Sequence, residues 1–143
     1  MERITQLIAD LTEYDSIAEG LKAGKSPVEV TGLAPIHKAN LTAALAGQLH
    51  KQAVVICADD LACSRMARDL EAFSERPVEI LPAREFVFHN IESSSREYEH
   101  KRISALRNLR LGKKTIVTTV PALLMATMPP EKMQEAMFSI DFN

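Results

Sequence analysis

Residues 31–41, TGLAPIHKANL, come close to the loop by which many proteins hold the phosphates of a nucleotide. That loop consists of a glycine, four residues, a glycine and a lysine, and then a serine or threonine. Gly32 and Lys38 stand at the first glycine and lysine positions, whereas His37 replaces the second glycine and Ala39 replaces the hydroxyl residue. The alternatives are a divergent nucleotide site, the frame of a site that no longer binds, or an ordinary turn into a helix.

Each departure from the pattern removes a part of the phosphate chemistry. Pro35 has no N–H to donate to a phosphate, and His37 carries a Cβ where glycine permits the backbone to approach closely. Ala39 has no oxygen for magnesium, so Lys38 is left as a single point charge. We therefore expect this loop to bind no cofactor, and we expect no catalytic residue and no metal site in the chain.

Asp59 and Asp60 follow the apolar run AVVICA, residues 53–58. One interpretation makes them magnesium ligands that act with Lys38 in a divergent P-loop ATPase or kinase. The other places them at the start of a helix, where acidic side chains interact favourably with the helix dipole. We expect the second.

The composition describes a globular protein without a strong charge. The chain has 143 residues, of which 46% are hydrophobic and 25% charged, and its net charge of −2 gives no general attraction to DNA or to anionic membranes. Cys57 and Cys63 are expected to be reduced thiols, and no spacing suggests zinc. The N-terminus lacks the apolar core of a signal peptide, and no apolar run is long enough to cross a bilayer. These features predict a cytoplasmic, soluble protein with no membrane contact.

Strand-like and helix-like segments alternate along the chain. Apolar residues at three- and four-residue steps predict helices, whereas short β-branched or continuous apolar runs predict strands. Strands are expected at 28–32, 53–58, 78–83 and 115–120, and helices at 3–22, 37–51, 61–74, 94–111, 121–128 and 130–137. This order predicts an α/β fold, a three-layer parallel sheet with helices on both faces, whose binding crevice lies at the carboxyl ends of the strands.

The elements also suggest how the chain is organised. Residues 1–26 are expected to be an N-terminal amphipathic helix that packs on the domain, and residues 27–137 the α/β domain itself. FSIDFN, residues 138–143, alternates like the beginning of a following strand or inserted domain, and 84–95 has no clear period and is interpreted as a loop. The run 53–58 is expected to be covered on both faces. We expect the helix after it to turn four side chains inward: Leu61, Met66, Leu70 and Phe73.

Several segments, taken in order, resemble the N-terminal region of bacterial transcription-repair coupling factors. They are VTGL…KANLTAAL, AVVICADDLACSRMARDLEAF, VEILPARE, ESSSREYEHKRISALRNLRLGKKTIVTTVPALL and MPPE, and the resemblance covers about residues 28–132. It implies a P-loop NTPase- or helicase-like fold, similar to the first domain of excinuclease B, with a degenerate phosphate loop at Gly32, His37, Lys38 and Ala39. The family consists of ATP-dependent DNA translocases that use ATP and magnesium, displace stalled RNA polymerase and recruit nucleotide excision repair.

The resemblance implies a role without catalysis for this region. The chain has no match to the Asp-Glu box of the motor and no second motor lobe, so the implied role is a scaffold for partner docking and autoinhibitory packing. Implied partners are excinuclease A through the adjacent inserted domain, other domains of the same protein, and RNA polymerase and DNA through downstream domains.

Two groups of residues are weaker candidates for contacts with nucleic acid. The resemblance places Ser64, Thr118 and Thr119 in segments near the nucleic-acid backbone in active helicases, although helix capping and packing are the preferred interpretation. The second group is a basic helix, for which we expect a solvated surface because acidic residues are interleaved; its cations are Arg96, Lys101, Arg102, Arg107, Arg110, Lys113 and Lys114.

Overall fold

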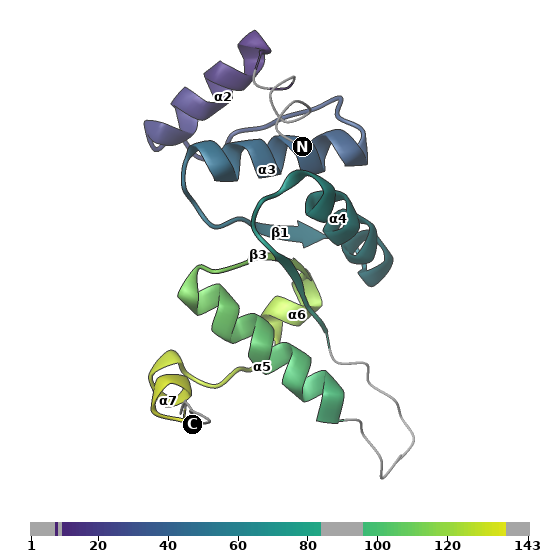
Figure 1. Ribbon diagram of the computed structural model, residues 1–143, viewed down its shortest axis with the longest axis vertical. Helices are drawn as coiled ribbons and strands as arrows, with labels where there is room; N and C mark the ends of the chain where they lie inside the picture. Colours follow the sequence, from purple (N-terminus) through teal and green to yellow (C-terminus); the bar gives the residue numbers. More distant parts are fainter. Residues whose placement is uncertain (1–7, 9, 84–95, 137–143) are drawn as a thin grey trace, which may run out of the picture.

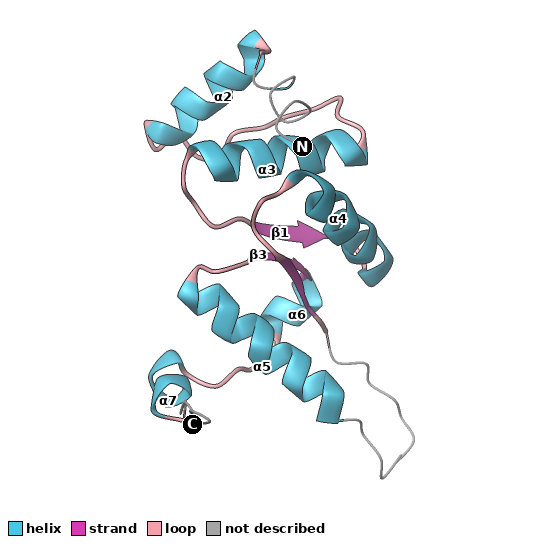
Figure 2. Ribbon diagram, viewed as in Figure 1, coloured by secondary structure: helices cyan, strands magenta, loops and turns pink. Residues whose placement is uncertain are grey.

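Three short parallel strands form the sheet of the computed structural model, which describes residue 8, residues 10–83 and residues 96–136 (Figures 1 and 2). The strands are β1 (Val54–Cys57), β2 (Val78–Leu81) and β3 (Thr115–Thr119), in the spatial order β1-β3-β2. Val117 of the middle strand β3 is in register with Val55 on one side and with Ile80 on the other. All five residues of β3 are buried, as expected of a central strand rich in β-branched residues.

Helices cover both faces of this sheet. The described helices are α2 (Thr12–Lys22), α3 (Pro35–Gln48), α4 (Asp60–Phe73), α5 (Arg96–Leu111), α6 (Val120–Leu124) and α7 (Pro130–Glu135). Helices α3 and α4 pack together on one side of the sheet, and α5 lies against β2 and β3 on the other side. The predicted α/β class, with a parallel sheet between helical layers, is confirmed. None of the helices in the described ranges is long and apolar enough to cross a membrane.

The core is divided into two clusters because neighbouring residues of a strand point to opposite faces. On the α3–α4 side, Val117 packs with Ala39 of α3 and with three residues of α4, which are Cys63, Ala67 and Leu70. On the α5 side, Ile116 packs with Leu81 and Ala105.

The predicted strand at 28–32 is wrong. Residues 25–34 form neither helix nor strand, and Val28 and Val30 are 37% and 38% exposed. A short alternating segment becomes a strand only where a neighbour accepts its hydrogen bonds, and the described part of the sheet offers this segment none.

The expectation that β1 is covered on both faces is also wrong. Val54 and Ile56 are 45% and 55% exposed, whereas Val55 and Cys57 pack against the core. Helix α5 lies over β2 and β3, so the same face of β1 receives no comparable cover from the described helices.

The inward set predicted for α4 is correct except for Leu61. Leu61 is 60% exposed, whereas Leu70 is fully buried and Met66 and Phe73 pack against the core. The buried positions of α4 are 63, 67 and 70, and Leu61 lies two residues before the first of them, on the opposite side of the helix. The predicted loop at 84–95 and the predicted strand start at 138–143 lie outside the described residues.

Candidate functional site

The loop that resembles a phosphate site leads into α3 at the carboxyl end of β1. Helix α3 runs antiparallel to β1, so its first turn lies toward the end of the strand from which the chain enters α4 (Figure 1). Lys38 and the pair Asp59–Asp60 therefore belong to the same end of the sheet. Among residues 10–83, however, Lys38 forms no ion pair with either carboxylate.

Two main-chain N–H groups in the first turn of α3 already form hydrogen bonds within the protein. Pro35 is its first residue, and the main-chain N–H groups of His37 and Lys38 donate to the carbonyl oxygen of Ala34 at 3.0 and 3.1 Å. Gly32 has a φ of +78°, a conformation that favours glycine. The described residues before Gly32 contain no strand, although a working phosphate loop follows a strand directly.

The side chains of this turn offer little to a magnesium ion. Ala39 is fully buried in the core cluster, so a methyl group stands where the pattern requires a hydroxyl. The next hydroxyl, Thr42 Oγ1, donates to the carbonyl oxygen of Lys38 at 2.8 Å. His37 and Lys38, the ionisable residues of the turn, are exposed.

Asp59 starts helix α4, as predicted. Its Oδ1 accepts a hydrogen bond from the Ala62 N–H at 2.7 Å, and Asp60 occupies the first turn. An N-cap aspartate satisfies a main-chain donor that otherwise lacks a partner. Within the described ranges, no three His, Cys, Asp or Glu side chains gather closely enough to hold a metal ion.

The three hydroxyl candidates bond to the main chain of the protein itself. Ser64 Oγ donates to the Asp60 carbonyl at 2.9 Å, and Thr118 Oγ1, fully buried, donates to the Leu81 carbonyl at 3.0 Å. Thr119 is the N-cap of α6 and accepts from the Ala122 N–H at 3.4 Å. These bonds give each hydroxyl a role in the fold, and a contact with nucleic acid stays a prediction.

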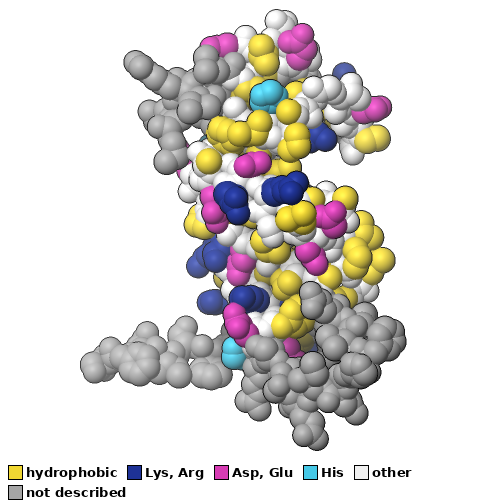
Figure 3. Space-filling view, turned by 90° about the vertical axis from the view of Figure 1, so that its right-hand side faces the viewer, with side chains coloured by type: hydrophobic (Ala, Val, Ile, Leu, Met, Phe, Trp, Pro, Cys, Tyr) yellow, Lys and Arg dark blue, Asp and Glu magenta, His cyan; other side chains and the backbone are white. Residues whose placement is uncertain are grey.

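Arg102 departs from the solvated surface that was expected for the basic helix. Its side chain is only 7% exposed, whereas Lys101, Arg107, Arg110 and Lys113 are exposed. Acidic side chains are interspersed with the cations on the face shown in Figure 3, so that face carries no continuous basic surface.

The guanidinium of Arg102 connects three main-chain segments. Nη1 donates to the Pro82 carbonyl at 2.9 Å, and Nη2 donates to the carbonyls of Ala122 and Met125 at 2.9 and 3.5 Å. The sequence did contain a signal for this burial, because Arg102 precedes Ala105, Leu106 and Leu109 by three, four and seven residues.

A second polar cluster that sequence reasoning missed surrounds Glu79 of β2. Its carboxylate accepts from Ser104 Oγ and Asn108 Nδ2, both at 2.7 Å, and lies 3.1 Å from Lys114 Nζ. Burial alone would disfavour the charged form. The hydrogen bonds from Ser104, Asn108 and Lys114 outweigh burial, so the pKa of Glu79 is lowered. The signal was a single carboxylate in the middle of the apolar strand VEIL.

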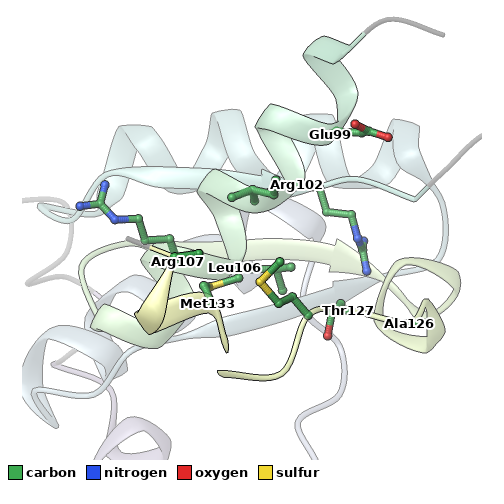
Figure 4. A pocket seen from close by; sticks show the side chains of 10 residues that line it. Glu99, Arg102, Leu106, Arg107, Ala126, Thr127 and Met133 are labelled. Atoms are coloured by element: carbon green, nitrogen blue, oxygen red, sulfur yellow. The ribbon is translucent and has the colours of Figure 1, made fainter. Parts of the chain in front are cut away.

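Two hollows in the described part of the chain lie away from the phosphate-like loop. One, of about 480 Å³, lies between α5 and residues 126–136, with Leu106 and Met133 among its apolar lining and Glu99 and Arg107 toward opposite ends (Figure 4). The other, of about 560 Å³, lies between Tyr14, the end of α3 and residues 73–76. The loop residues, the aspartate pair and the three hydroxyl candidates line neither hollow.

Comparison with known proteins gives one result that bears on function. The transcription-repair-coupling factor of Bacillus subtilis (strain 168) is 26% identical to this chain over 131 residues. The match covers 91% of the chain but only 11% of that protein's length, so the chain is related to one region of it at most. No family model matches the chain. No solved structure matches it significantly.

Proposed function

We propose that this chain is a non-catalytic N-terminal domain of a transcription-repair coupling factor, in which it serves as a scaffold. In this role it displays a docking site for partners and packs against other domains to restrain the translocase. The proposal is supported by the similarity over 91% of the chain to the Bacillus subtilis protein. Partner contacts with excinuclease A, RNA polymerase and DNA, and the use of ATP and magnesium, belong to the whole protein in this proposal.

The hydrogen bonding and the residue types in the first turn of α3 support the non-catalytic part of the proposal. A phosphate cradle needs free main-chain donors and a hydroxyl for magnesium. Here the His37 N–H bonds to Ala34, and the position of the hydroxyl is taken by the buried methyl of Ala39. A helix N-terminus with only Lys38 beside it binds anions weakly and without selectivity for nucleotides.

The alternative, a divergent P-loop ATPase or kinase that uses Lys38 with Asp59 or Asp60, is not favoured. The Asp59 carboxylate bonds to the Ala62 N–H at 2.7 Å, as a helix cap does. A magnesium ligand in this place would have to give up that bond or share it.

Calorimetric titration of the 143-residue protein with ATP and magnesium tests this part. We expect no binding heat above dilution for the wild type, and the same result for Lys38→Ala. Micromolar binding that Lys38→Ala abolishes would restore the enzyme hypothesis. The double variant His37→Gly, Ala39→Thr serves as a comparison, because it returns a glycine and a hydroxyl to the pattern without changing Lys38.

The scaffold role is tested in the related protein. The segment of the Bacillus subtilis coupling factor that matches this chain is replaced by residues 1–143, and ATP hydrolysis and release of stalled RNA polymerase are measured. We expect the chimera to behave like the parent protein, and deletion of the segment to raise ATP hydrolysis. If deletion leaves hydrolysis and polymerase release unchanged, the restraining role is refuted.

A further inference from the structure

Cys57 and Cys63, the two cysteines of the chain, face the same cluster of the core. Cys57 is the last residue of β1 and is in register with Thr119, two positions beyond the pair formed by partly buried Val55 and buried Val117. It therefore points to the same side of the sheet as those valines, and it packs against the cluster that contains Cys63. Cys63 lies at the start of α4, where its N–H donates to the Asp59 carbonyl at 2.9 Å.

The two thiols are neighbours but differ in their access to water. Cys63 is 1% exposed, and Cys57 is partly exposed. Burial raises the pKa of Cys63 to about 12, and the nearby Cys57 side chain adds to that increase. Cys63 therefore stays a protonated thiol at neutral pH. Cys57 is the sulfur that a dissolved reagent reaches first.

We infer that Cys57 and Cys63 form an oxidation site, in which hydrogen peroxide converts two neighbouring thiols into an intramolecular disulfide. The Cys57 thiolate attacks the peroxide, the O–O bond breaks, and Cys57 becomes a sulfenic acid while the departing oxygen leaves as water after protonation. The Cys63 sulfur then attacks the Cys57 sulfur, the S–O bond breaks, and the hydroxyl leaves as water with the Cys63 proton. In sum, two thiols lose two electrons and two protons, and the peroxide is reduced to two molecules of water.

The position of the pair gives this reaction a structural consequence. A disulfide would join the carboxyl end of β1 to the first turns of α4 and enclose the turn in which Asp59 caps that helix. Ala39, in the first turn of α3, packs in the same cluster. The bond would therefore fix the end of β1 relative to the start of α4, beside the part of α3 that contains Ala39. The inference depends only on this packing and not on the proposed function.

The sequence makes the product easy to identify. Trypsin cleaves after Lys51 and Arg65 and at no residue between them, so one peptide, QAVVICADDLACSR, contains both cysteines. The folded protein is treated with hydrogen peroxide, its remaining thiols are alkylated, and this peptide is weighed by mass spectrometry. We expect the unalkylated peptide, lighter than the dithiol form by two hydrogen atoms, and its return to the dialkylated form when a reductant is added before alkylation.

Two single variants test the order of the steps. Cys63→Ala leaves Cys57 without a neighbouring thiol, so we expect its peptide to gain one or more oxygen atoms instead of losing hydrogen. Cys57→Ser leaves only the buried thiol, and we expect the folded variant to react with peroxide at least about tenfold more slowly than the wild type. Equal rates for Cys57→Ser and the wild type would overturn the assignment of Cys57 as the attacking sulfur.

Other products from the wild type would overturn the site as a whole. Two such products are a disulfide-linked dimer and a peptide with added oxygen in place of the disulfide. A third such result is that both cysteines of the folded protein stay fully alkylated under conditions in which the urea-unfolded chain forms the disulfide. Titration with phenylarsine oxide gives an independent reading, because one arsenic atom bridges two adjacent thiols. We expect one equivalent of phenylarsine oxide to protect both thiols of the folded protein from alkylation. If neither hydrogen peroxide nor phenylarsine oxide protects the thiols, the two cysteines are not adjacent.

Discussion

Arg102 Nη2 donates to the carbonyl oxygen of Ala122 at a distance of 2.9 Å, and this contact joins α5 to α6 across the carboxyl end of the sheet. Arg102 is 7% exposed, and the other acceptors of its guanidinium are also main-chain carbonyls. A buried cation of this kind positions the segments that leave β2 and β3. It is thus part of the framework of the fold and does not belong to a basic surface.

Replacing Arg102 should therefore destabilise the protein strongly. We expect Arg102→Ala to lower the free energy of unfolding by about 3 kcal/mol, because several charge-assisted hydrogen bonds are lost, including the buried one to the Ala122 carbonyl. Arg107→Ala, on the exposed side of the same helix, should change it by less than about 0.5 kcal/mol. Urea unfolding followed by circular dichroism measures both, and equal values would show that Arg102 does not connect these segments.

Glu79 makes the stability depend on pH in a defined direction. Because its pKa is lowered in the folded state, its stabilising contribution is complete above the pKa of an unfolded glutamate, about 4.3, and is lost as the pH falls through the lower folded value. We expect Glu79→Gln to cost about 1 kcal/mol at pH 7. The difference between variant and wild type should shrink below about pH 4.

Unfolding experiments at several pH values between about 7 and 3 test this expectation. Glu99→Gln, on the exposed side of α5, is the matched control and should run parallel to the wild type over the whole range. A Glu79→Gln deficit that grows as the pH falls would contradict the direction of the shift.

A helix-capping role and a metal-binding role of Asp59 predict different effects of magnesium on stability. As the N-cap of α4 it should contribute about 1 kcal/mol, so Asp59→Ala is expected to lower the melting temperature in the presence or absence of magnesium. Asp60→Ala removes only a favourable interaction with the helix dipole and should cost about 0.5 kcal/mol. Thermal unfolding with and without millimolar magnesium distinguishes the roles, since a metal ligand would make magnesium stabilise the wild type but not Asp59→Ala.

The one-sided cover of β1 predicts opposite behaviour for neighbouring residues. Val55 packs against the core, so Val55→Ser should cost about 2 kcal/mol. Ile56 is 55% exposed and should tolerate serine with a loss of less than about 1 kcal/mol. Chemical unfolding of the two variants gives the comparison, and a larger loss at Ile56 would mean that this face of β1 is covered in solution.

The regular elements were predictable where local pattern and burial agree. The α4 and β3 segments were predicted to within two residues, because a stripe of apolar residues or a β-branched run was followed by the burial it implied. The segment 28–32 failed because alternation alone does not supply a hydrogen-bonded neighbour. Glu79 and Arg102 were missed as polar core residues, because their partners are 25 and 20 residues away in the chain and no local pattern shows that they meet.

The sequence by itself determined the alternation of helices and strands, the start of α4 at the aspartate pair, and the missing glycine and hydroxyl of the phosphate pattern. These are properties of residue types and of spacing within one or two turns of chain. The tertiary structure alone decided that β1 is covered on one face, that Arg102 donates to the carbonyls of Pro82 and Ala122, and that Cys57 and Cys63 share one cluster. Those outcomes depend on which strands become neighbours and where α5 lies on the sheet, and such contacts are set by packing between distant segments.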